Sequence, residues 1–480
     1  MDRGETRKML EGHPGNIPEG KKLPQFMAAG AATLIALSGG CSLAWTSPAL
    51  LILQAKDSWL PVSTEEGSLV GSILALGAIA GALPAGSIAE KFGRKPVLLS
   101  LSVPFILSFL LIAFANSVGM LYAARFIAGV ATGASCVLAP MYISEIAENS
   151  VRGTLGSFFQ LLITIGIFIV YCLGIAANYD VLSWVCFAMP IVFLAAFVWM
   201  PEAPKYLLSA GKRTEAEKSL SRLRGMDDVS AELSEIQRAV DEEANAKENT
   251  SIKDLFSSKT TLKALLICLG IMVFQQLSGV NAVIFYTGDI FKDAGSGLPT
   301  AISPVIVGAV QTVATGVAAA LVDRAGRRIL LLLSSSMMAV CLAALGAYFN
   351  IRGPGEEPSE ASKSLGWLPL VSLTVFIIVF SLGFGPIPWA LTGELFAPNV
   401  KGIASGVAVG INWTMAFVVT KIFPTLRTSI GSDYTFWMFA LLNVASVTFV
   451  LFLVLETKGK SLQQIQKELE TSGTAIKCCC

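Results

Sequence analysis

Long runs of apolar residues recur along this chain, separated by short polar connections. A helix that crosses a bilayer needs about 20 mostly apolar residues, and twelve segments meet that requirement. They lie at 26–52, 67–89, 96–116, 119–142, 153–176, 181–200, 262–291, 299–322, 329–349, 367–396, 402–424 and 433–455. One such run can be the buried helix of a soluble protein. Twelve of them predict an all-α, multi-pass membrane protein with twelve transmembrane helices.

A polar central segment separates the first six runs from the last six, and this divides the chain into five predicted regions. These are an N-terminal tail (1–25), a six-helix bundle (26–200), a linker (201–261), a second six-helix bundle (262–455) and a C-terminal tail (456–480). Apolar residues in the linker recur at roughly helical spacing among charged ones. That spacing favours short surface helices, with a disordered linker as the alternative.

Basic residues gather on one side of the predicted spans. Besides the N-terminal tail and the linker, they lie in two short loops, at Lys91, Arg94, Lys95, Arg324, Arg327 and Arg328. Cytoplasmic loops of membrane proteins are enriched in Lys and Arg. We therefore expect both termini and the linker in the cytoplasm, and we expect the protein in the plasma membrane.

Composition supports the lipid bilayer as the surroundings and narrows the chemistry. Hydrophobic residues make up 54% of the chain and charged residues only 14%, against about 25% charged in soluble domains. A net charge of +1 gives no indication of nucleic-acid binding. The nine cysteines form no CxxC pair, and the single histidine, His13, lies in a polar tail. We expect no metal, no cofactor and no enzyme activity, and no obligate protein partner is evident.

Three motifs occur twice, in the same order and six spans apart, which predicts two similar bundles in tandem. FGRK at 92–95 corresponds to DRAGRR at 323–328, and ISEIAENSVRG at 143–153 corresponds to TGELFAPNVKG at 392–402. PEAPKYLL at 201–208 corresponds to ETKGKSL at 456–462. Two like bundles whose interface crosses the membrane are typical of transporters, which open that interface to each side in turn.

With these motifs in view, the chain resembles the sugar porter family of the major facilitator superfamily. FQQLSGVNAVIFY at 274–286 and GFGPIPW at 383–389 add to the resemblance, which covers about residues 26–462. Within the family, the chain is most similar to facilitative glucose transporters and insect trehalose transporters. The resemblance implies the major facilitator fold, alternating access and a sugar substrate.

A pocket for a neutral sugar needs amide groups and an aromatic face. By resemblance, Gln160, Gln275, Gln276, Asn281 and Asn412 match sugar ligands of the family, and Trp389 matches a pocket tryptophan. Gln311 belongs to the same predicted set, and the neighbouring aromatic residues are Phe285, Tyr286 and Trp413. The alternative is that amides inside spans serve as contacts between helices. Ser381 stands where the best-known members have Glu, and a wider site that admits a disaccharide would follow.

Charged residues of the repeated motifs suggest a gate on the cytoplasmic side. In the implied fold, Glu145 and Arg152 lie near Arg94, and Glu394 and Lys401 lie near Arg327. We hypothesise that these groups form ion pairs that close this side and separate when it opens.

The sequence therefore predicts facilitative (uniport) transport of a sugar, a hexose such as glucose or the disaccharide trehalose. The first span carries no acid between Leu23 and Gln54, which argues against proton coupling, and Asp289 is the one candidate for it. A proton-coupled symporter, a transporter of another polyol-like solute and a sugar sensor stay as alternatives.

Overall fold

The structure is a computed structural model that describes residues 20–148, 150–175, 178–247, 258–294, 302–353, 364–396, 398–458, 460 and 462–471. These residues form helices and contain no strand. Among them, eleven helical segments are long and apolar enough to cross a membrane, and Ile302–Ala318 is a shorter apolar helix. The predicted all-α, multi-pass membrane architecture is confirmed.

The helices of the N-terminal half are α2 (Lys22–Ala44), α3 (Thr46–Leu53), α4 (Thr64–Phe92), α5 (Arg94–Ser100), α6 (Ser102–Ala113), α7 (Val118–Ile146), α8 (Arg152–Gly174) and α9 (Tyr179–Phe197). The linker contains α10 (Pro204–Ser209), α11 (Arg213–Arg224) and α12 (Ser230–Lys247). The C-terminal half contains α14 (Lys259–Leu277), α15 (Val280–Ala294), α16 (Ile302–Ala325), α17 (Arg327–Arg352), α19 (Leu368–Leu382), α20 (Ile387–Glu394), α21 (Pro398–Ile430), α22 (Ser432–Leu453) and α23 (Leu462–Thr471).

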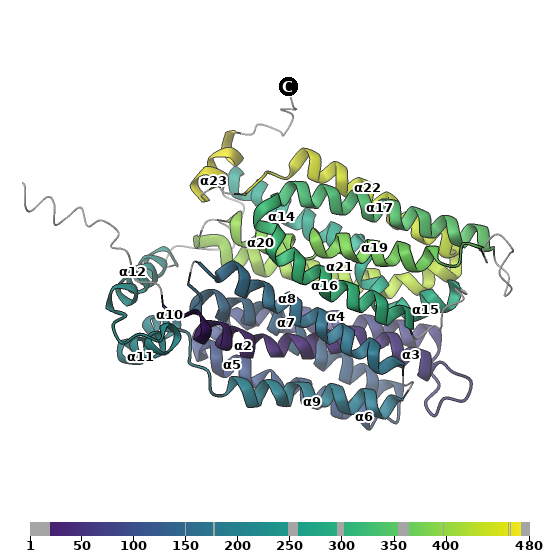
Figure 1. Ribbon diagram of the computed structural model, residues 1–480, viewed down its shortest axis with the longest axis horizontal. Helices are drawn as coiled ribbons and strands as arrows, with labels where there is room; N and C mark the ends of the chain where they lie inside the picture. The colour runs from purple at the N-terminus through teal and green to yellow at the C-terminus, as the bar shows by residue number, and fades with distance from the viewer. Residues whose placement is uncertain are drawn as a thin grey trace, which may run out of the picture.

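Helices α2 to α9 lie together along one side of the elongated molecule, and α14 to α22 lie along the other (Figure 1). The linker helices and α23 lie at one end, which we call the motif end because the repeated motifs at Arg94 and Arg327 lie there. We call the opposite end, where α3 leads into the loop at 54–63, the loop end. The two halves meet along α4 and α21 and along α8 and α16.

Two of the predicted spans are broken near their middle, and the breaks shape the candidate site. The run at 262–291 divides into α14 and α15 at Gly279, whose φ of 87° is open to glycine but costly for other residues. The run at 367–396 divides into α19 and α20 at residues 383–386. Pro386 supplies no N–H to a continuing helix, which explains a break at this point.

The repeated glycine–arginine motif has the same local structure in both halves. Gly93 and Gly326 precede α5 and α17 with φ of 104° and 95°. The carboxylate of Glu202 accepts hydrogen bonds from the Lys95 amide at 3.0 and 3.1 Å. Glu456 likewise accepts the amides of Arg327 at 2.9 Å and Arg328 at 3.1 Å. A carboxylate stabilises the unpaired N–H groups at a helix start, which gives the repeat its physical reason.

The linker helices are attached to the N-terminal half through Arg224, whose side chain is buried. Arg224 pairs with Glu148 at 3.2 Å and with Glu232 at 2.6 Å, and it donates a 2.9 Å hydrogen bond to the Ile146 carbonyl. The described part of the linker is thus helical and packed, as the spacing of its apolar residues predicts.

Candidate functional site

Four amide side chains from three helices form one hydrogen-bonded cluster in the C-terminal half. We call Gln275, Gln276, Asn281 and Asn412 the amide cluster. Gln275 and Gln276 lie in the last turn of α14, Asn281 lies in the first turn of α15 beyond the glycine break, and Asn412 lies in the middle of α21. The break at Gly279 lets Asn281, which follows it, contact Gln276, which precedes it.

The cluster is connected by three hydrogen bonds between side chains. Asn412 donates to Gln275 Oε1 at 2.7 Å, Gln276 donates to Asn412 Oδ1 at 3.0 Å, and Asn281 donates to Gln276 Oε1 at 2.5 Å. Asn412 also donates to the carbonyl of Met272 at 3.2 Å. Gln275, Gln276 and Asn412 are all at least 95% buried. The cluster is polar and carries no charge.

The second broken span meets the cluster at its break. Gln275 Nε2 donates to the carbonyl of Phe384 at 2.6 Å and to that of Gly385 at 3.2 Å. These carbonyls are available because the helix is interrupted between α19 and α20. Trp389, one turn further on in α20, is half-buried against the core. Gln275, which lies just before the first break, therefore contacts the backbone of the second break directly.

Two further predicted ligands lie on the helices at the seam between the halves. Gln160 is half-buried on α8, and Gln311 is 98% buried on α16 with no hydrogen-bond partner for its Oε1 atom. The two helices pack together, and Thr312 donates to the carbonyl of Thr164 at 3.3 Å. No hydrogen bond among the described residues links Gln160 or Gln311 to the amide cluster.

The three predicted aromatic residues are buried. Tyr286 bends α15, with φ of −117° and ψ of 20°, and its hydroxyl donates to the Thr420 carbonyl at 3.2 Å. Phe285 lies beside it in the core. Trp413 follows Asn412 on α21, and its indole N–H has no partner. In this conformation, Tyr286 helps to join α15 to α21.

The predicted gating charges are brought together only in part. Arg94 binds Glu145 Oε1 through Nε at 3.0 Å and through Nη2 at 2.8 Å, and both side chains are more than 90% buried. Arg152 is exposed, and the hydrogen bond it makes is to the Ala147 carbonyl at 3.4 Å. The backbone amide of Arg327 binds Glu456. The side chains of Glu394 and Lys401 lie outside the described residues.

Hydrogen bonds between the two halves close the loop end, and sequence reasoning missed the residues that make them. The Gly288 amide donates to Ser47 Oγ at 3.1 Å, and the Tyr171 hydroxyl donates to the Ile284 carbonyl at 2.8 Å. Hydroxyl groups inside apolar spans were the available signal, but they usually bond to their own helix. Glu202 and Glu456 were also missed as carboxylate caps, although their motifs are repeated.

Comparison with known proteins places this arrangement in a family. Residues 35–469 match the family described as "Sugar (and other) transporter". The chain belongs to this family. Its members are transporters rather than enzymes, and the match covers most of both halves of the chain.

Among curated relatives of this sugar transporter chain are proteins named facilitated trehalose transporter Tret1. The one from Polypedilum vanderplanki is 40% identical over 93% of this chain and 88% of its own length. The one from Aedes aegypti is 39% identical over 93% of this chain, which spans 55% of that relative.

Solved structures share the major facilitator fold. The xylose transporter XylE from E. coli, in a partially occluded inward-open conformation, has a TM-score of 0.76 at 24% identity. That match covers 91% of this chain and 99% of XylE. The human organic anion transporter MFSD10 has a TM-score of 0.57 at 16% identity, covering 89% of this chain and 99% of its own. Because the two neighbours are named for unlike solutes, the fold alone does not identify a substrate.

Proposed function

We propose that this protein is a facilitative uniporter of a neutral sugar, a hexose such as glucose or the disaccharide trehalose, and that it works by alternating access. The amide cluster carries the proposal. Its side chains offer both hydrogen-bond donors and acceptors without a charge, which suits a solute covered with hydroxyl groups. Inside a membrane, polar side chains of this kind usually face a cavity or a solute pathway, because exposing them to lipid costs free energy.

The hydrogen bonds within the amide cluster limit the affinity that we expect for a sugar. In the conformation described, the amides bond to one another, so a sugar hydroxyl replaces bonds that already exist. Each exchange yields about 0.5–1.5 kcal/mol. Four to six such bonds, less the cost of ordering, correspond to a millimolar constant, or about −4 kcal/mol. Weak binding suits a protein that must release its solute on the far side.

The same amides also hold helices together, and this is the competing role. Gln275 spans both helix breaks, so a sugar that engages it would act on α14, α19 and α20 at once. We propose that Gln160, Gln311 and Trp389 complete the pocket when the two halves close around the solute. On this proposal Arg94 and Glu145, which belong to one half, fix the shape of that half at the motif end.

Trehalose is the sugar that we favour. Relatives at about 40% identity carry that substrate in their names. Ser381, next to the end of α19, is a small residue beside the break that Gln275 contacts, and a small side chain at this position suits a larger solute. From the bias of basic residues, we place the motif end in the cytoplasm and the protein in the plasma membrane.

Uptake of labelled trehalose and labelled glucose into expressing cells, at acidic and at neutral pH, tests the proposal. Saturable uptake that is insensitive to pH, with a raised KM for the sugar in Asn412→Asp, supports uniport and identifies the sugar. Uptake that requires acid favours a proton symporter instead, with Asp289 on α15 as its titrating group. Absence of uptake by protein shown to be at the cell surface would favour another polyol-like solute or a sensor.

A further inference from the structure

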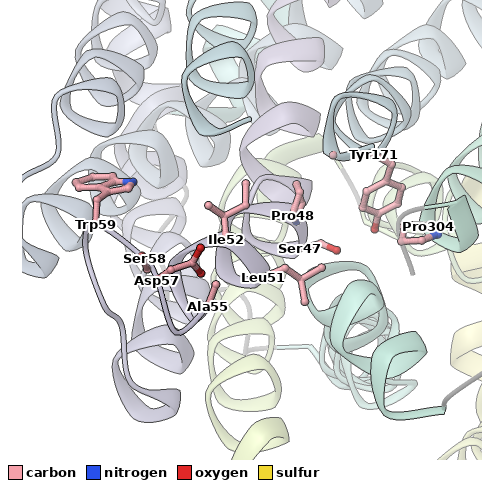
Figure 2. A pocket seen from close by; sticks show the side chains of 11 residues that line it. Ser47, Pro48, Leu51, Ile52, Ala55, Asp57, Ser58, Trp59, Tyr171 and Pro304 are labelled. Atoms are coloured by element: carbon pink, nitrogen blue, oxygen red, sulfur yellow. The ribbon is translucent and has the colours of Figure 1, made fainter. Parts of the chain in front are cut away.

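A cavity of about 480 Å³ opens at the loop end, away from the amide cluster. It lies between the end of α3, the end of α8 and the start of α16, with the loop after α3 forming one side (Figure 2). Pockets for small molecules measure about 300–1,000 Å³, so its size is sufficient for one ligand. Its walls come from both halves of the molecule, since Tyr171 belongs to α8 and Pro304 to α16.

Most polar groups around this cavity are already bonded to the protein. Ser47 Oγ accepts the Gly288 amide, and the Tyr171 hydroxyl donates to the Ile284 carbonyl. Ser58 Oγ donates to a carbonyl of its own loop at 3.1 Å. The remaining surface is largely aliphatic. A sugar would find few free hydrogen-bond partners here, so this cavity does not suit the solute proposed above.

Asp57 and Trp59 give the cavity its specific chemistry. Asp57 is the one charged residue among those lining it, and it forms no ion pair with any residue that the structure describes. Trp59 is 54% exposed, and its ring makes an edge contact with Tyr179 at 5.4 Å, which fixes its position. Figure 2 shows Asp57 and Trp59 on one side and Tyr171 and Pro304 on the other. The apolar walls of the cavity suit a flat aromatic ring, and the Asp57 carboxylate at its rim suits a positively charged group attached to that ring.

We propose that this cavity binds a small aromatic cation and that the bound ligand holds the loop end closed. The closing hydrogen bonds at Ser47 and Tyr171 form part of the cavity wall. Opening the loop end breaks them and separates Tyr171 from Pro304, which removes the cavity. A ligand that binds one conformation shifts the population toward it. This second step rests on the alternating access proposed above, whereas binding itself does not.

Binding is measured by calorimetry on the full chain in nanodiscs of zwitterionic lipid, with empty nanodiscs to correct for partition into lipid. Three probes share one ring: tryptamine is a cation, tryptophol is neutral and indole-3-propionate is an anion. Tryptamine should bind about twofold to fivefold more tightly than tryptophol, the range for a partly exposed ion pair, and the anion should bind weakest.

Two variants with matched controls locate the site. Asp57→Asn should remove the preference for tryptamine over tryptophol, while Glu65→Gln, an exposed acid of α4 outside the lining, should keep it. Ala55→Trp places a large ring in the cavity from an exposed position and should weaken both probes about tenfold or more, because the filled space leaves no room. Ala55→Ser should bind as the unaltered protein does. Equal binding by Asp57→Asn and the unaltered protein, or undiminished binding by Ala55→Trp, overturns the proposal.

Uptake measurements then separate the site from the transport function. Where the unaltered protein takes up sugar, tryptamine should lower Vmax, leave KM for the sugar unchanged, and lose its effect in Ala55→Trp. A rise in KM alone would place tryptamine in the sugar path and overturn the conformational step. If the probes and variants bind as predicted but the protein takes up no sugar, the proposed ligand site is supported and the uniport proposal fails.

Discussion

The side-chain amide of Asn412 on α21 donates a 2.7 Å hydrogen bond to the side-chain oxygen of Gln275 on α14. Its own oxygen accepts from Gln276 at 3.0 Å, so Asn412 occupies the centre of the amide cluster. A sugar ligand and a structural contact would both use this residue, and the two roles predict different measurements.

Asn412→Asp keeps the size of the side chain but removes the donor to Gln275. We expect KM for the transported sugar to rise about tenfold, because one lost partner in a buried amide network costs about 1–3 kcal/mol. Uptake over a range of sugar concentrations measures this change, and surface labelling corrects for the amount of protein present.

Asn443 on α22 provides the matched control. It is a buried amide of the same half, and it donates to the carbonyls of Phe439 at 2.8 Å and Ser278 at 3.3 Å, outside the cluster. Asn443→Asp should lower the melting temperature of the purified protein and leave KM unchanged. Equal effects of both variants on KM would assign the cluster a structural role.

The sequence predicted an all-α, multi-pass membrane protein, because long hydrophobic runs are strong local signals. Polar groups inside those runs pointed to the amides that form the cluster, and their role as sugar ligands stays a prediction. The resemblance implied that Arg94 and Arg152 both lie near Glu145. The structure pairs Arg94 with Glu145 across 51 residues of sequence, whereas Arg152, closer to Glu145 in sequence, is exposed. Pairing of this kind depends on how helices pack, and a motif reports only that a charge is present. The cavity at the loop end depends on the spacing of three helices and leaves no pattern in the chain.

The buried ion pair between Arg94 and Glu145 should respond to single and double changes differently. Arg94→Ala leaves a carboxylate buried without its partner, which destabilises the protein by about 3–5 kcal/mol. Exchange of the two residues, Arg94→Glu with Glu145→Arg, should recover part of the uptake that each single exchange loses. Melting temperature and uptake together follow the effect.

Arg152→Ala serves as the control for that pair. Because Arg152 is exposed, its removal should change melting temperature and uptake little. If the double exchange recovers nothing beyond the single ones, Arg94 and Glu145 do not act as a pair in transport.

Glu148, between α7 and α8, should make stability depend on pH. Burial alone would raise the pKa of Glu148, but hydrogen bonds from Lys22 and the Gly20 amide, with the charge of Arg224, hold that pKa below its ordinary value of 4.5. A lowered carboxyl pKa stabilises the folded protein at pH values above the ordinary pKa, and this contribution is lost as the pH falls through the folded pKa.

Glu148→Gln should therefore melt earlier than the unaltered protein at neutral pH, by an amount equivalent to about 1–2 kcal/mol for lost charged hydrogen bonds. The difference in melting temperature should shrink as the pH is lowered below 4.5. Glu215→Gln, which alters an exposed pair with Lys212 at 3.7 Å, should show no difference at either pH. A difference in melting temperature that does not change with pH would show that ionisation of Glu148 is not its cause.

Gly288 on α15 lies where the two halves meet at the loop end, and a larger residue there should favour the open form. A Cβ atom at this position would lie 2.7 Å from Leu51 Cδ1 and 3.3 Å from Ser47 Oγ, on α3 of the other half. Gly288→Val should push α3 and α15 apart and weaken the bond to Ser47, at a cost of about 1–3 kcal/mol to the closed form. Such a cost moves a balanced equilibrium at least several-fold toward the open form.

Distances between spin labels at Trp59 and Ile302, both exposed at the loop end, would report this shift. We expect a longer and more populated open distance in Gly288→Val than in the unaltered protein. Gly406→Val is the control, because a Cβ atom at Gly406 meets nothing within 4 Å. Identical distance distributions in all three proteins would show that contact between α3 and α15 does not hold the loop end closed. Since the cavity proposed for an aromatic cation shares this wall, Gly288→Val should also weaken tryptamine binding, and Gly406→Val should not.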